Sequence, residues 1–361
     1  MGGALRTGRR GVRSGFAVSQ ASGYYLSYAH DVIYGWDTET APLYHRADGS
    51  SVQGGDIVRN VCLADCFARL ADEGVRLLYQ GDLATRLVKA SDEQGGLITK
   101  RDLEEYKPVV RPPSRTALRG WDVATNSPPA VGGATMTAIL RLVERLDIRG
   151  WTASDVARFA SAQAAVFSFR QSVLDGDTDR FAGVEMLLNL AEAGNLEELH
   201  SSPSTVHASA VDETGLACSI TASAGYGSGV VIPGTGFGLN NSLGELELTS
   251  EGLHALAPGA RLLSNMAPTV ARSADGEVMA LGSPGAARIT SAIASVLMNH
   301  IVCGMDLETA VAHPRIHAEV FEGAPMLAVE PGIDTSKVQN LAIRTLPAPS
   351  MYFGGVQAAM W

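Results

Sequence analysis

Two hydroxyl side chains, those of Thr205 and Ser223, lie at the outer ends of two extended segments. Residues 205–212 carry a polar side chain at alternate positions over most of their length, and residues 216–223 resume an extended pattern. The break between the segments is short and ends in Gly215. Two extended runs around such a break predict a β-hairpin. The two hydroxyl groups would then meet at its open end.

The register of this hairpin follows from a loop centred on Thr214. Thr205 then lies directly opposite Ser223, and His207 lies opposite Thr221. Because successive side chains of a strand point to opposite faces, these four side chains share one face. Ordinary β-branched and small polar residues on a half-exposed strand would give the same pattern, and this alternative stays open.

A threonine hydroxyl attacks carbonyl carbons poorly unless a base lies beside it. At the start of a chain, threonine carries its own base, the α-amine, with a pKa of about 7.7–8. Thr205 lies inside the chain, so this chemistry requires cleavage of the Ser204–Thr205 bond. The preceding residues 191–204 are polar and become loop-like, as a segment to be cut should be. Ser223 would donate a hydrogen bond to the Thr205 oxygen.

A second candidate feature is the turn at residues 282–287, between a buried strand at 279–281 and a helix at 288–302. Backbone N–H groups at a strand–turn–helix junction point outward and favour negative charge. In acyl transfer that charge develops on the carbonyl oxygen, so the turn is a candidate oxyanion hole. A tight turn that simply needs glycine is the alternative.

Several helices must position these features. Apolar residues at helical spacing predict helices over residues 56–79 and after Gln80-Gly81-Asp82, and Thr99 to Asp102 has the form of a capping box. A strand is expected at 119–125, and helices are expected at 134–146, 151–172 and 182–196.

The charge, the spacing of cysteines and histidines, and the apolar stretches of the sequence argue against several kinds of partner and site. A net charge of −10 argues against nucleic acid and anionic membranes as partners. The spacing of the four cysteines is not that of a zinc site. His313 and His317 have the spacing of a metal-binding helix pair, but Pro314 follows His313 and no acidic residue lies between them, which argues against a metal site. The basic N-terminus has no apolar core after it, and the longest apolar stretch, 289–302, is too short for a bilayer. We therefore expect a cytoplasmic protein.

The hairpin sequence, with the motifs around it, resembles the γ-glutamyltranspeptidases. The similarity begins at Thr205-Val206-His207-Ala208-Ser209-Ala210-Val211-Asp212 and is spread over nearly all of the chain. Its further motifs are Gly95-Gly96-Leu97-Ile98-Thr99, Pro128-Pro129-Ala130-Val131-Gly132-Gly133, Leu239-Asn240-Asn241, Ser264-Asn265-Met266, Gly282-Ser283-Pro284-Gly285-Ala286-Ala287-Arg288 and Pro314-Arg315-Ile316-His317. The resemblance implies an α+β fold, the four-layer αββα sandwich of the N-terminal-nucleophile hydrolases.

The resemblance also implies roles for particular residues. Thr205 would be freed by self-cleavage after Ser204, and the amides of Gly285 and Ala286 would stabilise the oxyanion. Residues 1–204 would then be a partial large-subunit-like region and 205–361 a small-subunit-like region, the two halves forming one intertwined heterodimer. The substrate would be a small γ-glutamyl or related amide, and no cofactor or metal is implied.

The substrate pocket departs from the family pattern. After Asn241 the family usually has Gln or Glu and, three residues later, an Asp that pairs with the substrate's α-amine; here these positions hold Ser242 and Glu245. The usual Ser-Ser pair at the substrate carboxylate is Ser264-Asn265. The family also usually has glycine where this chain has Ala286, so a left-handed backbone there would be costly.

The chain resembles a family member that lacks the opening of the large subunit and the last strand. An incomplete sheet would expose unpaired edges and apolar surface. The expected protein is thus a fragment, or a chain completed by a partner or by further copies of itself. Three hypotheses follow: a self-processing γ-glutamyltranspeptidase-like enzyme, a relative repurposed for another small molecule, and an inactive remnant or binding subunit.

Overall fold

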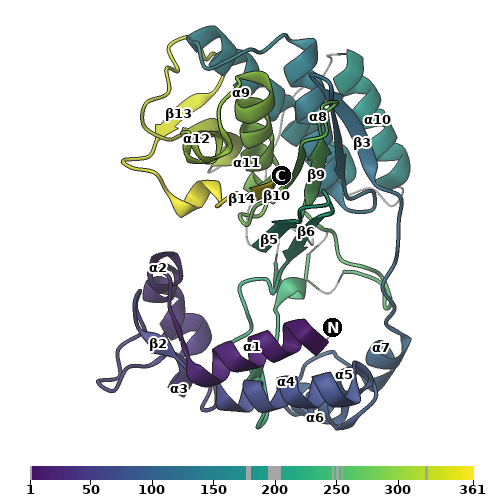
Figure 1. The fold of residues 1–361 in the computed structure, drawn as a ribbon, viewed down its shortest axis with the longest axis vertical. Coiled ribbons are helices and arrows are strands. Elements are labelled where there is room, and N and C mark those ends of the chain that lie inside the picture. Colours follow the sequence, from purple (N-terminus) through teal and green to yellow (C-terminus); the bar gives the residue numbers. More distant parts are fainter. Residues whose placement is uncertain are drawn as a thin grey trace. The chain divides into compact units, whose positions relative to one another are not determined.

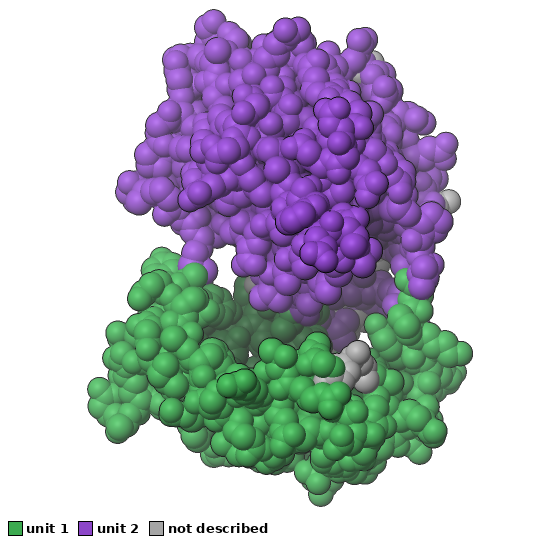
Figure 2. Space-filling view, in the orientation of Figure 1, with its two compact units in different colours: residues 1–109, 224–242 green, residues 110–223, 243–361 purple. Residues whose placement is uncertain are grey.

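The computed structural model describes residues 2–175, 180–193, 205–245, 248, 252–253, 255–321 and 324–361. The chain divides into two compact units (Figure 2). Unit 1 comprises residues 1–109 and 224–242, and unit 2 comprises residues 110–223 and 243–361. The predicted nucleophile hairpin and the predicted oxyanion turn both belong to unit 2.

Unit 2 is built on a five-stranded antiparallel sheet in the order β14-β10-β9-β4-β3 (Figure 1). Its strands are β3 (Ser114–Leu118), β4 (Trp121–Thr125), β9 (Thr269–Arg272), β10 (Val278–Gly282) and β14 (Gln357–Met360). All five residues of β10 are buried, which fits a strand covered on both faces.

Helices cover one face of this sheet. They are α8 (Val131–Arg145), α9 (Ala153–Phe169), α10 (Arg180–Ala193), α11 (Arg288–Leu297) and α12 (Leu307–Ala312), with π-helical turns at Arg170–Leu174 and Met298–Val302. Met279 and Leu281 of β10 join one large apolar cluster with Ile139 and Leu140 of α8 and Ile293 of α11. This cluster is the core of unit 2.

A hairpin covers the opposite face of β10. It consists of β5 (Val206–Val211) and β6 (Ala217–Ala222), which pack against β10 (Figure 1). Unit 2 therefore has the layer order helix, sheet, sheet that the αββα sandwich predicts. A separate sheet, β11 (Ile316–Phe321), β12 (Ala324–Val329) and β13 (Ala342–Thr345), also borders the core, and a 3₁₀ turn spans Met351–Phe353.

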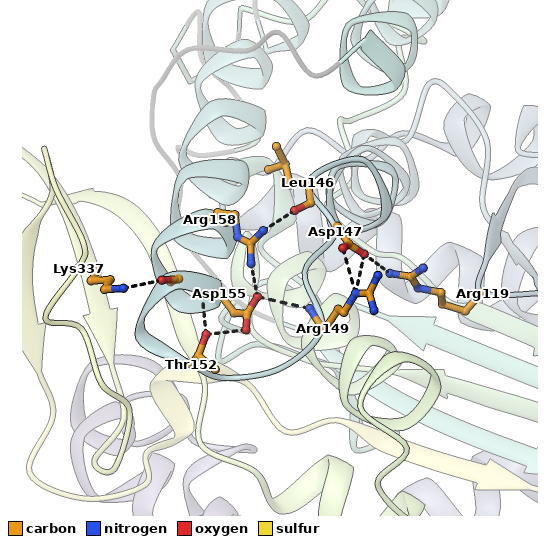
Figure 3. Close-up of polar contacts among 9 residues, drawn as sticks. Arg119, Leu146, Asp147, Arg149, Thr152, Asp155, Arg158 and Lys337 are labelled. Carbon is orange, nitrogen blue, oxygen red and sulfur yellow. Dashed lines mark hydrogen bonds and ion pairs between the residues drawn. The ribbon is translucent and has the colours of Figure 1, made fainter.

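A polar network fixes the corner between α8 and α9 (Figure 3). The Thr152 side chain caps α9 by accepting a hydrogen bond from the Asp155 amide at 3.2 Å. Asp155 in turn accepts a hydrogen bond from Arg158 at 2.6 Å, and Arg158 donates to the Leu146 carbonyl at 2.8 Å. Both helix ends thus share partners, so the direction of α9 relative to α8 is set by side chains.

Unit 1 is mostly helical. Its elements are α1 (Gly2–Ser14), β1 (Phe16–Ala17), α2 (Gln20–Ala29), a π-helical turn at His30–Tyr34, α3 (Ala41–Tyr44), β2 (Ile57–Val58), α4 (Val61–Glu73), α5 (Arg76–Tyr79), α6 (Asp82–Glu93), α7 (Lys100–Glu105), β7 (Val231–Ile232) and β8 (Phe237–Gly238). Residues 224–242 join it through polar contacts. The Tyr25 and Tyr34 hydroxyls donate to the Tyr226 carbonyl at 3.1 and 3.0 Å.

The predicted helices are largely confirmed, except that the one predicted over 56–79 is interrupted at Gly74 and is also wrong at its start. The capping box at Thr99 and Asp102 is present, and α8 begins three residues before the predicted start. The helix predicted over 56–79 is wrong at its start, because Ile57–Val58 pairs with Phe16–Ala17 as strands. The Asn60 side chain accepts a hydrogen bond from the Leu63 amide and so begins the helix there.

Candidate active site

The hairpin has the register that the sequence predicts. His207 lies opposite Thr221, and Val206 lies opposite Ala222, so Thr205 and Ser223 follow at the open end. At the closed end, the Asp212 carboxylate accepts hydrogen bonds from the amides of Thr214 and Leu216 at 2.9 and 3.0 Å. These hydrogen bonds close the turn, and the turn in this way sets which residues of the two strands are paired.

The hairpin turns its polar face inward and its apolar face outward. Leu216, Val206 and Ile220 are 70%, 66% and 58% exposed. On the inner face, the Ser219 hydroxyl donates to the Leu281 carbonyl at 2.9 Å and accepts from the Thr269 amide at 3.0 Å. The inward hydroxyl groups therefore bind the main chain of the central sheet.

His207 was not among the predicted site residues, although it lies at the centre of this polar face. Its imidazole contacts the Thr221 hydroxyl through Nδ1 and the Ser209 hydroxyl through Nε2, both at 2.8 Å. Burial lowers the pKa of His207 from its ordinary value. The available sequence signal was that His207 is the one strongly titratable side chain in a row of hydroxyl groups.

The predicted oxyanion turn has two consecutive residues with positive φ, Gly285 at 123° and Ala286 at 56°. Within the described part of the chain, the amides of Gly285 and Ala286 donate to no other protein group. They precede α11, as the unpaired amides of a helix start do. Ala286 holds the left-handed conformation that favours glycine, at a cost of roughly 1–2 kcal/mol.

The hairpin and the turn point to the same edge of the central sheet. Ser219 lies at Leu281, and His207, the partner of Thr221, lies against Gly282. Strand β6, followed toward Ser223, therefore runs in the same direction as strand β10, followed toward the turn. The open end of the hairpin, with Thr205 and Ser223, thus lies at the same edge as the amides of Gly285 and Ala286.

The predicted substrate residues Ser264 and Asn265 pack on the start of α8. The Ser264 carbonyl accepts hydrogen bonds from the amides of Val131 and Gly132 at 3.0 and 3.2 Å. A Cβ atom at Gly132 would lie 2.1 Å from the Asn265 carbonyl oxygen, so only glycine fits. The Asn265 side chain is buried, and within the described residues its oxygen accepts no hydrogen bond. Glu245 is also buried in unit 2.

Asn241 and Ser242 belong to unit 1. The Asn241 side chain accepts a hydrogen bond from the Tyr226 amide at 2.7 Å, and the Ser242 amide donates to the Asn240 side chain at 3.0 Å. These contacts order the glycine-rich segment, and the binding roles of both residues stay predictions. Ser204 and residues 194–203 lie outside the described residues, so the cleavage and the division at 204 also stay predictions.

The two histidines with helical spacing lie on different elements. His313 stacks on Trp151 with ring centroids 4.6 Å apart, and His317 lies on β11 with its Nδ1 2.8 Å from the Ser291 hydroxyl. Burial, with the nearby positive charges of Arg288 and Arg170, holds the pKa of His317 well below its usual range. No group of three or more His, Cys, Asp or Glu among the described residues could hold a metal ion.

None of the described helices is both long enough and apolar enough to cross a membrane.

Comparison with known proteins supports the resemblance. The family model described as Gamma-glutamyltranspeptidase matches residues 5–361. Glutathione hydrolase proenzyme of Escherichia coli is 28% identical over 342 residues, which cover 84% of this chain and 58% of that protein. The corresponding protein of Pseudomonas aeruginosa is 30% identical over 306 residues, covering 75% and 54%. The chain thus spans a little over half the length of these relatives.

The fold is also found in solved structures. Cephalosporin acylase from Bacillus halodurans superimposes with a TM-score of 0.77 at 22% identity, covering 98% of this chain and 70% of that one. This similarity shows the fold, that of the N-terminal-nucleophile hydrolases. Because the family model covers nearly the whole sequence, the chain belongs to the γ-glutamyltranspeptidase family.

Proposed function

We propose that this chain is a self-processing amidohydrolase or acyltransferase whose nucleophile is Thr205. One observation carries the proposal: the hairpin register brings Thr205 and Ser223 to the edge of the sheet at which the Gly285 and Ala286 amides have no acceptor among the described residues. A nucleophile and oxyanion donors at one edge are what acyl transfer requires. The printed names of the relatives, glutathione hydrolase proenzymes, support a precursor that is cut.

The first reaction is self-cleavage. The Thr205 hydroxyl attacks the Ser204 carbonyl carbon, the Ser204–Thr205 C–N bond breaks, and the former amide nitrogen takes up a proton to become the Thr205 α-amine. Water then hydrolyses the resulting ester. The products are two chains, residues 1–204 and 205–361, held together as a heterodimer.

The second reaction uses the new α-amine as the base. It accepts the Thr205 hydroxyl proton while the oxygen bonds to the carbonyl carbon of a γ-glutamyl amide. The amides of Gly285 and Ala286 stabilise the negative oxygen, and the proton passes to the departing amine. Water or a second amine then resolves the acyl-enzyme. Ser223 holds the Thr205 oxygen in line through a hydrogen bond.

A second candidate is hydrolysis of a small amide that is not γ-glutamyl. The buried Asn265, Ser242 in place of Gln or Glu, and the longer Glu245 all change groups expected at the substrate's α-amine and carboxylate. An acylase, Acylase ACY 1 proenzyme of a Pseudomonas species, is among the relatives at 29% identity.

Intact mass and sequencing of the amino ends test the main proposal. After incubation, the wild-type chain should show a second amino end that reads Thr-Val-His-Ala, and Thr205→Ala should stay intact. A folded wild-type chain that remains uncut would overturn the mechanism. The substrate is tested by comparing a γ-glutamyl anilide with a glutaryl anilide, which lacks the α-amine. A preference for γ-glutamyl supports the first candidate, and a preference for glutaryl supports the second.

A further inference from the structure

We propose that His207 is a positioning residue that fixes the distance between the nucleophile hairpin and the oxyanion turn. This inference rests on the proposed function and names a residue to which the reaction so far assigns no role. His207 lies two residues after Thr205 on the same face of β5, and it contacts both the hairpin and the end of β10.

The hydrogen bonds around His207 define a single direction. The Ser209 hydroxyl donates to the Gln357 carbonyl at 3.3 Å, so its oxygen accepts from His207 Nε2–H. Burial lowers the pKa of His207 and so favours the neutral ring, in which Nδ1 carries no proton and accepts from the Thr221 hydroxyl. The ring is therefore neutral and in the Nε2–H form, with both nitrogens occupied. It is a strut from β5 to β6 and β10, linked to β14 through the Ser209 hydroxyl, and not a base for the reaction.

The face of the ring lies directly on Gly282. A Cβ atom at Gly282 would lie 2.2 Å from Cε1 and 2.3 Å from Nδ1 of His207. Atoms do not approach this closely, so a glycine is needed at this position for space. Gly282 is the last residue of β10, and its strand partner on β14 is Gln357, the residue whose carbonyl Ser209 contacts. His207 thus touches the strand immediately before the oxyanion turn.

The far side of the turn is supported independently. A Cβ atom at Gly354 would lie 2.3 Å from the Pro284 carbonyl oxygen, so the two backbones are in close contact. Arg315, which is buried, donates to the Gly354 carbonyl at 3.2 Å and to the Val311 carbonyl at 2.7 Å. The turn is held between Gly354 and the strand under His207. Of the two supports, His207 is the one that also sits on the nucleophile strand.

This arrangement predicts a specific kinetic effect. His207→Ala would let the hairpin shift against β10, and an error of about 1 Å in a reacting geometry can cost on the order of 100-fold in rate. We expect kcat to fall about 10- to 100-fold, with KM changed less than about two-fold, because both ring nitrogens of His207 already bind hydroxyl groups of the hairpin. His313→Ala, in the same unit but away from the hairpin, serves as the matched control and should leave kcat unchanged.

The decisive experiment pairs His207→Ala with Gly282→Ala. Gly282→Ala alone should also lower kcat, because its methyl group meets the ring. Removing the ring makes room for that methyl group, so the double variant should be no slower than His207→Ala alone. Additive losses, or wild-type kcat in His207→Ala, would overturn the proposal. The loss of kcat at constant KM distinguishes positioning from a general loss of folded protein, which melting temperatures monitor.

A second readout does not depend on activity. In the uncut Thr205→Ala chain, ¹H–¹⁵N spectra of the imidazole should show His207 neutral with the proton on Nε2, the signal being assigned by its absence in a variant that also carries His207→Ala. A proton on Nδ1 would contradict the inference. If the wild-type chain neither cleaves nor turns over substrate but this tautomer is found, the proposed function fails while the strut geometry stands.

Discussion

In the proposed mechanism the hairpin β5–β6 acts through side chains, whereas the turn from Gly282 to Ala287 acts through main-chain amides. Alanine at Thr205 or Ser223 would remove the hydroxyl group, and alanine adopts an extended backbone without strain. In the turn, every residue except proline keeps an amide, but two positive φ angles restrict which residues can hold it in place. The activity of the first region should thus depend on which side-chain atoms are present. The activity of the second region should depend on the backbone conformation.

The largest effect is expected at the nucleophile. Thr205→Ala removes the attacking oxygen, and we expect turnover of an amide substrate to fall by about 10³-fold or more. Thr205→Ser keeps the oxygen and should retain cleavage and measurable turnover. Steady-state rates on preparations of equal folded content measure both. Equal activity of the alanine and serine variants would show that the hairpin does not act through this hydroxyl.

The next largest effect is expected in the turn, through conformation alone. Gly285→Ala keeps the amide but adds a Cβ atom 3.0 Å from the Gly354 Cα at a φ of 123°. Because a displaced oxyanion donor costs about 10²–10³-fold in kcat, we expect a loss near the lower end of this range. Gly355→Ala is the matched control, since no atom lies within 4 Å of its Cβ position. Similar kcat values for the two variants would contradict the proposal that the turn acts through its backbone conformation.

Ser223→Ala should have an intermediate effect. It removes the hydrogen bond that we propose from Ser223 to the Thr205 oxygen, and such a bond is worth roughly 1.5–3 kcal/mol when its partner becomes charged, or about 10- to 100-fold in kcat. Ser223→Thr restores the hydroxyl and should restore most of the rate. Full activity in Ser223→Ala would place the orienting group elsewhere.

A smaller effect concerns stability. Ala286→Gly relieves the left-handed backbone but loses a buried methyl group worth about 0.8 kcal/mol, so the net change should stay within about 1 kcal/mol. Ala287 is buried too but has an ordinary φ of −67°, so Ala287→Gly relieves nothing. Urea unfolding should show the Ala286 variant more stable than the Ala287 variant by about 1–2 kcal/mol. The reverse order would mean that the turn is not strained at Ala286.

The smallest expected effect is a pH dependence at the hairpin. Burial lowers the pKa of His207 in the folded chain, so below about pH 6.5 the unfolded chain binds a proton that the folded chain does not. Folding stability from this residue is therefore present at neutral pH and decreases as the pH falls from about 6.5 through the folded-state pKa. His207→Gln should show a shallower loss of stability over this window than the wild-type chain. Identical slopes would contradict a neutral, buried His207.

The sequence predicted the hairpin well because its register depends on local information. The alternating pattern and the Asp212 turn lie within twenty residues, and the observed pairs are those expected. It also predicted that a left-handed residue at 286 would be costly, but not that the backbone adopts this conformation. The contact between His207 and Gly282 joins residues far apart in the chain, so no periodicity could reveal it. The same is true of Arg315 and Gly354.

The strand β3 was missed for a related reason. Residues 114–118 are short and half polar, and they form a strand because β4 pairs with them through a tight turn at Arg119 and Gly120, both with positive φ. The residue pattern of β3 by itself is not typical of a strand. Pairing with a neighbour thus decided the structure where the local preference did not.

The outward side of the hairpin has a practical consequence for handling the protein. The apolar sheet surface formed by Val206, Leu216 and Ile220 is exposed to solvent. Two molecules can bury it by associating through this surface. In concentrated samples the chain should therefore aggregate first through this surface. A dye that fluoresces on binding to apolar surfaces should bind there. Ile220→Thr keeps the branched shape that strands favour while adding a hydroxyl group, and it should raise the concentration at which the chain stays dispersed.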